Sequence, residues 1–255
     1  MRIGILKWLN GCLSYNDCVA SQRPFKALLF DADGTLYDSS PLHFEAYKRT
    51  SRELYDFNFT PELFKEECIG KYKKPTQVLR EHGVPCVDAD FRALKQPYYE
   101  TLAAEKLRVT PGLLELLDAT SKHGISCAVV TGASRHSVNF SLDLLGIRKY
   151  FSVLILQEDT AHQKPHPQPF QLAAQRLGRN PKECCAFEDT APGVASAKAA
   201  GMFCFGIRNG GNTPEELVGA DLIVQNFHAL QHSCSAGEIA IHMPPIPPAL
   251  DPMRG

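Results

Sequence analysis

The sequence lacks any long apolar run and any large excess of charge of one sign. Its longest apolar stretches are a few residues long, such as ALLF at 27–30, whereas a membrane-spanning helix needs about 20 mostly apolar residues. Lysine and arginine total 27 and aspartate and glutamate total 28, so the net charge is −1. That balance argues against binding nucleic acid through bulk positive charge. We therefore expect neither a membrane nor a nucleic acid as a partner.

The cysteine spacing of a metal site is also absent, although Cys184 and Cys185 are adjacent. The nine cysteines are scattered, and no pair has the C-x-x-C spacing of a zinc site. Reduced thiols are typical of a cytosol-like compartment, so we expect a cytoplasmic protein. We expect residues 1–24 to be a disordered leader, because Lys7 and Asn10 interrupt the apolar segment that a secretory signal would need. An organellar transit peptide is the alternative, since no acid precedes Asp17.

Short apolar runs alternate with helical patterns along most of the chain. The runs lie at 26–30, 125–130, 152–156, 184–187, 203–207 and 221–224. Between them, 135–146 and 168–178 repeat apolar residues at helical spacing and end at a glycine. Strand–helix alternation with continuously apolar strands predicts an α/β fold, a doubly wound parallel sheet with helices on both faces.

Two segments depart from that alternation. Residues 40–104 carry helical patterns without a convincing buried strand, so we expect a small α-helical domain inserted into the sheet domain, which would comprise 25–39 and 105–232. From Met243 onward five prolines occur within thirteen residues, and prolines cannot join a helix or a central strand. We therefore interpret 233–255 as a proline-rich, disordered tail.

Polar side chains follow four of the apolar runs. They are Asp31 and Asp33, Thr131 and Gly132, Lys164, and Glu188 with Asp189. Each has an ordinary structural explanation when taken alone, as a turn residue, a helix cap, a solvated charge or an acid favoured by a helix dipole. Because ligands bind at the carboxyl ends of parallel strands, their joint occurrence there favours a single crevice.

Four motifs give the chain a specific resemblance. They are FDADGTLYDSS at 30–40, VVTGAS at 129–134, QKPHPQPF at 163–170 and FEDTAPGVASAKAAGM at 187–202. Over about residues 25–225 the chain resembles the haloacid dehalogenase superfamily of phosphohydrolases. The resemblance implies a Rossmann-like sheet, and the 40–104 insertion resembles the helical cap of the family's β-phosphoglucomutase- and phosphatase-like members.

The resemblance also implies roles for individual residues. Asp31 would be the nucleophile that forms an aspartyl-phosphate, and Asp33 the general acid and base. Asp31, Asp189 and the backbone carbonyl of Asp33 would bind Mg²⁺, with Glu188 bound directly or through water. Thr131, Gly132 and Lys164 would hold the phosphoryl oxygens. A cation and a lysine suit this chemistry because they offset the repulsion between a carboxylate and an anionic phosphate.

The same resemblance also reduces the number of candidate reactions. Dehalogenases generally lack the second aspartate, and phosphonate-cleaving members carry a small residue there, so Asp33 argues against both. We expect a Mg²⁺-dependent phosphatase acting on a small phosphorylated metabolite, a sugar or polyol phosphate, as a monomer or dimer. A sugar phosphomutase is the alternative, because it uses the same two aspartates. A catalytically idle binding protein is the third option, which the intact motif set disfavours.

The inserted segment would set the substrate. His43 matches a histidine near the acid/base aspartate of β-phosphoglucomutase-like members, although it could equally be a packed or solvated helix residue. Gly70, Lys73 and Lys74 lie where such insertions carry a specificity loop, and Lys95 is a weaker candidate. Mutases place an arginine in this loop. A lysine lacks the arginine's bidentate geometry, yet it still permits binding of an anionic substrate.

Overall fold

The computed structural model of the chain describes residues 24–71 and 73–243. The expected leader, except for Pro24, and the end of the expected tail from residue 244 lie outside these residues. The described residues divide into two compact units, one of residues 24–38 with 109–243 and the other of residues 39–71 with 73–108. The sequence patterns place the insertion at 40–104. Each unit is described separately.

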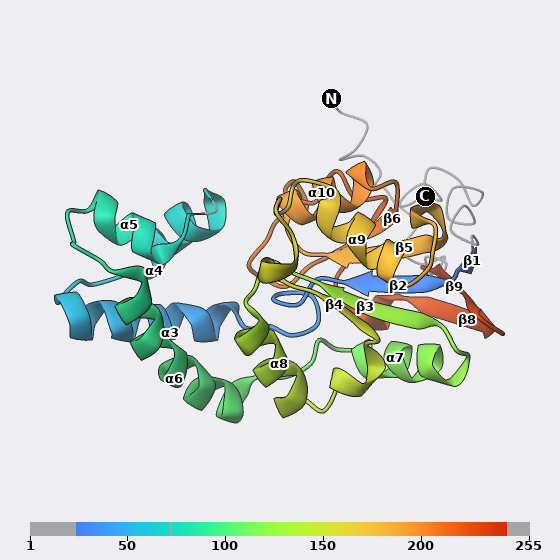
Figure 1. The fold of residues 1–255 in the computed structure, drawn as a ribbon, viewed down its shortest axis with the longest axis horizontal. Helices are drawn as coiled ribbons and strands as arrows, with labels where there is room; N and C mark the ends of the chain where they lie inside the picture. The colour runs from blue at the N-terminus through green and yellow to red at the C-terminus, as the bar shows by residue number, and fades with distance from the viewer. Residues whose placement is uncertain (1–23, 72, 244–255) are drawn as a thin grey trace, which may run out of the picture. The chain divides into compact units, whose positions relative to one another are not determined.

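A six-stranded parallel sheet forms the centre of the first unit (Figure 1). In chain order its strands are β2 (Ala27–Phe30), β3 (Ser126–Val130), β4 (Val153–Ile155), β5 (Cys184–Glu188), β6 (Phe203–Ile207) and β7 (Leu222–Val224). Their order across the sheet is β4-β3-β2-β5-β6-β7, so the chain winds outward in both directions from β2. The doubly wound, Rossmann-like α/β fold expected from the sequence is confirmed.

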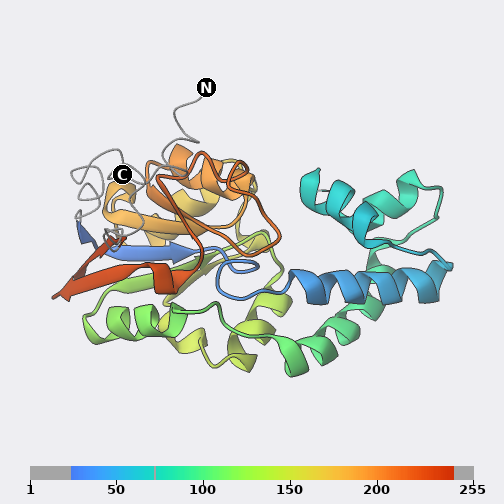
Figure 2. The ribbon, with the colours of Figure 1, turned by 180° about the vertical axis from the view of Figure 1, so that it is seen from behind.

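Helices cover both faces of this sheet (Figures 1 and 2). The helices α9 (Gln168–Arg176) and α10 (Ala191–Ala199) lie on one face, and α7 (Leu113–Lys122) and α8 (Arg135–Leu144) lie on the other. Short 3₁₀ turns complete the connections: η2 (Arg148–Tyr150), η3 (Gln157–Asp159), η4 (Pro181–Glu183) and η5 (Phe227–Ala229). No helix among the described residues is long and apolar enough to cross a membrane.

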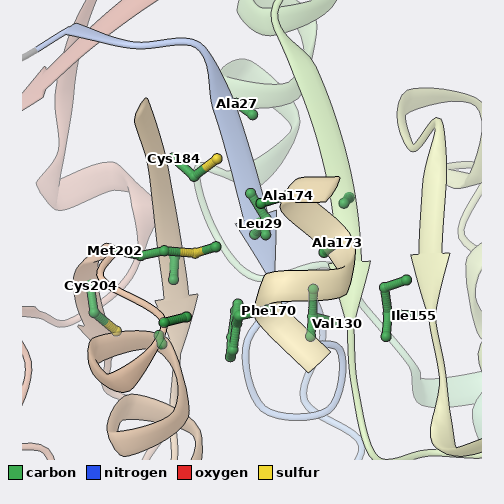
Figure 3. Close-up of a cluster of buried hydrophobic side chains, with 14 of the residues drawn as sticks. Ala27, Leu29, Val130, Ile155, Phe170, Ala173, Ala174, Cys184, Met202 and Cys204 are labelled. Atoms are coloured by element: carbon green, nitrogen blue, oxygen red, sulfur yellow. The ribbon is translucent and has the colours of Figure 1, made fainter. Parts of the chain in front are cut away.

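The core explains why the central strands are apolar without alternation. All four residues of β2 and all five of β5 are buried, because helices cover both faces. On one face, Phe170, Ala173 and Ala174 of α9 pack over Leu29 and its neighbours (Figure 3). On the other face the rings of Phe30, Phe187 and Phe205 stack in sequence, with centroids 4.8 and 5.2 Å apart. This packing fixes the strand ends relative to one another.

The end of the described chain differs from the expected disordered tail. Residues 231–242 form an antiparallel hairpin of β8 (Gln231–Ser235) and β9 (Glu238–His242). The strand β9 also pairs with β1 (Pro24–Phe25) in a three-stranded sheet. Ile239 and Ile241 alternate with more exposed residues and are fully buried, and Gly237 takes a positive φ of 76° at the turn. The alternation in EIAIH is therefore a strand pattern, and the prolines begin only after it.

The regular secondary structure of the second unit is all helical among its described residues. It comprises α3 (Ser40–Tyr55), α4 (Pro61–Leu63), the π-helical segment η1 (Phe64–Gly70), α5 (Pro75–Glu81) and α6 (Asp88–Lys106). Its own apolar core includes Phe59, Val78, Leu79 and Phe91, each at most 2% exposed. The unit therefore buries an apolar cluster of its own, as a separate small domain does.

The two chain segments that lead to and from the insertion are paired within the first unit. Tyr37 and Val109 form an antiparallel bridge. The Thr110 backbone N–H donates to the Leu36 carbonyl at 2.9 Å, and the Thr110 hydroxyl donates to the Thr35 carbonyl at 2.7 Å. The insertion thus leaves and re-enters the sheet domain at adjacent points.

We predict that Ile241→Ala lowers the free energy of unfolding of the first unit. Ile241 is fully buried, and truncating a buried isoleucine to alanine costs about 2–5 kcal/mol. Urea unfolding should show the loss, while Gln231→Ala, at an exposed position of β8, should change stability little. Equal, small effects of the two substitutions would show that the hairpin does not contribute to the core.

Candidate active site

Backbone pairing places three carboxylates at one edge of the sheet. Asp31 follows β2, and its N–H donates to the Phe187 carbonyl at 2.9 Å, which extends the pairing of β2 with β5 by one residue. Glu188 is the last residue of β5 and Asp189 follows it. Because β2 and β5 are parallel neighbours, their carboxyl ends bring these acids together. Glu188 is fully buried, and Asp31 and Asp189 are 8% and 7% exposed.

Lys164 joins this cluster from the loop before α9. Its Nζ lies 2.6 Å from Asp31 Oδ1 and 2.5 Å from Glu188 Oε1. It also donates to the Val130 carbonyl at 2.7 Å, next to Thr131. One ammonium group therefore uses its three donors to contact the ends of β2, β3 and β5.

Burial and mutual repulsion shift the ionisation of these groups. Burial raises the pKa of Asp31 to about 7, against the opposing effect of Lys164 and with a further increase from Glu188. Burial raises the pKa of Asp189 well above its usual range, and the charges of Asp31 and Glu188 add to the shift. Burial alone would lower the pKa of Lys164, but Asp31 and Glu188 hold it above its ordinary value. With all three acids ionised, the cluster would carry more negative charge than one ammonium group offsets.

That excess charge and the donor type fit a divalent cation. One carboxylate oxygen from each of Asp31, Glu188 and Asp189 lies within 4.8 Å of the other two. Three ionised carboxylates and one ammonium group leave two negative charges, which a divalent cation would neutralise. Hard carboxylate oxygens are the ligands that Mg²⁺ prefers in proteins. The three acids can therefore hold such an ion.

Two glycines permit the close packing of these carboxylates. A Cβ on Gly193, in the first turn of α10, would lie 2.0 Å from the Glu188 carboxylate. A Cβ on Gly34 would lie 2.1 Å from Asp189 Oδ2, and Gly34 also has a positive φ of 86°. Any larger residue would displace an acid at either position, so the glycines of the DADG and EDTAPG sequences have a steric role.

The remaining residues proposed from the first two motifs lie in the adjoining loops. Asp33 is half-buried two residues after Asp31. Thr131 is buried at the end of β3, where its Oγ1 accepts from the Ala133 N–H at 3.2 Å. Gly132 follows it in the loop before α8. The positions suit contact with a phosphate at this edge, and the roles assigned to all three residues stay predictions.

Within the inserted unit, the structure brings His43 of α3 and Lys95 of α6 together. Lys95 Nζ lies 2.8 Å from His43 Nδ1 and over the rings of Tyr99 and Tyr47, at 4.5 and 5.1 Å from their centroids. The His43 ring stacks on Tyr99 at 4.2 Å. An ammonium group can only donate, so in this arrangement Nδ1 of His43 is the acceptor. His43 is thus part of an aromatic cluster around a buried lysine.

Two lysines of the 70–75 segment, Lys71 and Lys73, are held by carboxylates of their own unit. Gly70 ends η1, and Lys73 lies 2.9 Å from Glu67 and 2.6 Å from Glu81. Hydrogen bonds from Lys71 and Lys73 lower the pKa of Glu67 to about 2. Lys74 is exposed at the residue before α5. The charge of Lys73 is therefore already balanced, and its role in substrate binding stays a prediction.

Three polar residues beside Asp189 are absent from the sequence-based prediction. The Thr35 hydroxyl donates to Asp189 Oδ1 at 3.2 Å, and the Asn209 amide donates to Oδ2 at 2.7 Å. Asn212 donates to the Asp189 backbone carbonyl at 2.7 Å. Both asparagines follow β6, so the strand-end rule that identifies the other residues also applies to RNGGN at 208–212.

Comparisons with known proteins agree with this geometry. A family model described as haloacid dehalogenase-like hydrolase matches residues 25–201. The chain is 32% identical over 232 residues to the phosphoglycolate phosphatase of Salmonella typhi, covering 80% of this chain and 90% of that protein. It is 30% identical over 179 residues to the phosphorylated carbohydrates phosphatase of Thermotoga maritima, covering 69% and 82%. The crystal structure of CbbY from Rhodobacter sphaeroides with phosphate has a TM-score of 0.72 at 27% identity, covering 80% and 95%.

We predict that the metal-free protein loses stability between about pH 4 and about pH 7 through Asp31. The pKa of Asp31 is raised from 3.8 to about 7, so in this window the folded protein holds a proton that the unfolded chain has released. Raising the pH therefore removes stability. An amide in place of this carboxyl has no such proton, so Asp31→Asn should gain stability relative to wild type as the pH rises. Urea unfolding in a chelator, at about pH 5 and about pH 8, measures the difference; a constant difference would contradict the shift.

Proposed function

This chain belongs to the haloacid dehalogenase-like hydrolases and is a phosphoric monoester hydrolase, and we propose that it is a Mg²⁺-dependent phosphatase of a sugar or polyol phosphate. The main observation in support of the proposal is the contact of the largely buried Lys164 with Asp31 and Glu188, beside Asp189. A phosphate monoester is an anion, and a carboxylate attacks it only where positive charge offsets the repulsion. Lys164 supplies part of that charge.

Asp31 is the nucleophile of the proposed reaction. One of its carboxylate oxygens bonds to phosphorus while the bond from phosphorus to the substrate's ester oxygen breaks, which gives an aspartyl-phosphate. Asp33 donates a proton to the departing oxygen, so the product leaves as an alcohol. Lys164 and Thr131 lie at the same strand ends and would hold the phosphoryl oxygens during the transfer.

Hydrolysis of the aspartyl-phosphate completes the cycle. Asp33, now a carboxylate, takes a proton from water as the water oxygen bonds to phosphorus. The bond between phosphorus and the Asp31 oxygen breaks, releasing inorganic phosphate and the Asp31 carboxylate. Each aspartate thus ends the cycle in the state in which it began.

Magnesium fits the acidic cluster in charge and donor type. Asp31, Glu188 and Asp189 would hold it, with the backbone carbonyl of Asp33 as a further ligand. Bound there, Mg²⁺ would act as a Lewis acid and offset negative charge on the phosphoryl group. It would also oppose protonation of Asp31, whose pKa of about 7 otherwise leaves part of the nucleophile uncharged near neutral pH.

The substrate class rests on the relatives and on the charge pairing in the inserted unit. One relative is named for phosphorylated carbohydrates and another for phosphoglycolate. Both names refer to small phosphorylated metabolites, and we propose the same substrate class for this chain. A mutase would need a cation for the second phosphate of its bisphosphate. Lys73, the candidate for that task, already pairs with Glu67 and Glu81. This pairing supports hydrolysis over phosphoryl migration.

The cysteines support a reducing compartment for this activity. The seven that lie among the described residues form no disulfide, and five of them are buried. Burial raises the pKa of the Cys127 thiol to about 12, so this group stays protonated and unreactive. On these grounds we propose a cytoplasmic location.

We predict that Asp31→Asn abolishes Mg²⁺-dependent phosphate release from an aryl phosphate and from sugar and polyol phosphates. The amide is isosteric but a poor nucleophile, and it is a weaker metal ligand. Asp143→Asn, at an exposed position of α8, is the matched control and should behave as wild type. Mass spectrometry of acid-quenched protein should detect a phosphoryl group on wild type only. Turnover by Asp31→Asn near the wild-type rate would rule out the covalent mechanism.

We predict that Asp33→Asn lowers kcat by roughly 10²–10⁴-fold, because general acid–base help contributes about that much. Its backbone carbonyl is unchanged, so Mg²⁺ affinity should fall less than in Asp189→Asn. Phosphate release at saturating Mg²⁺ measures the first effect, and calorimetric titration of the metal measures the second. A loss of metal affinity as large as that of Asp189→Asn would contradict the assigned division of roles.

A further inference from the structure

The loop after β6 contacts Asp189 through two asparagine side chains. Asn209 Nδ2 donates to Asp189 Oδ2 at 2.7 Å and lies 3.4 Å from the Gly34 carbonyl. Asn212 Nδ2 donates to the Asp189 carbonyl at 2.7 Å and to the Ile207 carbonyl at 2.9 Å. One amide thus contacts the carboxylate, and the other contacts the main chain that carries it.

The opposite end of the Asn209 amide is anchored in its own loop. Its Oδ1 accepts from the N–H groups of Gly211 and Asn212, at 3.0 and 3.3 Å. A flipped amide would place its oxygen against the Asp189 carboxylate and its NH₂ against two N–H donors. Both contacts would be repulsive, so the amide has one favourable orientation, with its donor towards Asp189.

The Asp189 carboxylate needs the hydrogen bond from Asn209 because the neighbouring carboxylates repel it. It is 7% exposed and lies beside the carboxylates of Asp31 and Glu188. Lys164 bonds to those two acids, whereas the donors recorded on the Asp189 carboxylate are the neutral Thr35 hydroxyl and Asn209 amide. These two donors contact different oxygens and so fix the rotation of the carboxylate.

We propose that Asn209 is a positioning residue that orients the Asp189 carboxylate for the metal and thereby sets the affinity of the site for a divalent cation. The inference rests on the proposed function, because it requires a cation bound by Asp31, Glu188 and Asp189. Hydrogen bonds that orient a ligating side chain are commonly worth 10–100-fold in metal affinity. Asn209 is the donor closest to the Asp189 carboxylate, and it lies in the loop after β6, a strand that supplies none of the three metal ligands.

The test is Mn²⁺ binding to the full chain, measured by electron paramagnetic resonance, in wild type, Asn209→Ala and Asn226→Ala. Asn226 is a matched control, because it is also half-buried and its Oδ1 also accepts from the N–H two residues on, that of His228, at 3.0 Å. We expect Asn209→Ala to raise the Kd for Mn²⁺ about 10–100-fold. Asn226→Ala should bind as wild type. Both variants should lose similar, small amounts of thermal stability in a chelator.

A kinetic readout separates positioning from a general structural role. In Asn209→Ala, the Mg²⁺ concentration for half-maximal phosphate release should rise by the same factor as the Kd, while kcat at saturating Mg²⁺ returns towards the wild-type value. Unchanged Mn²⁺ affinity in Asn209→Ala, with wild type binding normally, would overturn the inference and leave the proposed function intact. Failure of wild type itself to bind Mn²⁺ would overturn both.

Discussion

A single, largely buried ammonium group determines the arrangement of the site. Lys164 contacts Asp31, Glu188 and the Val130 carbonyl at 2.5–2.7 Å, and so links the ends of three strands. Buried acids at this density repel one another, and removing one partner of a buried ion pair typically costs about 3–5 kcal/mol. Three features of the fold maintain this charge arrangement. They are the parallel register of β2 and β5, the close packing of the carboxylates that Gly34 and Gly193 allow, and the loop that carries Lys164.

The central sheet could be predicted from the sequence because its strands are buried on both faces. Runs such as ALLF and CCAF are too short for helices and too apolar for an exposed surface, and their order along the chain gives the connectivity. The hairpin of β8 and β9 was missed for a physical reason. Its alternating segment EIAIH is only five residues long, and its partner strand β1 lies at the far end of the chain, so the local pattern does not identify that partner.

The candidate site was predictable to the extent that its residues follow strand ends. Asp31, Lys164, Glu188 and Asp189 were found in this way, and the structure brings them together. Asn209 was not, because asparagine beside glycines is equally typical of a turn. The pairing of His43 with Lys95 spans 52 residues between two helices. Such contacts depend on how helices pack, which periodicity alone does not determine.

The paired segments at the base of the insertion have an evolutionary consequence. Because Tyr37 bridges Val109 and Thr110 bonds to Leu36, the sheet domain itself brings the two attachment points together. Another segment could replace the insertion at little cost, since the entropy of closing a loop rises only slowly with its length. Under the proposed function, substrate preference can therefore diversify by exchange of the inserted unit, while the carboxylates and the lysine proposed to perform the chemistry stay in the sheet domain.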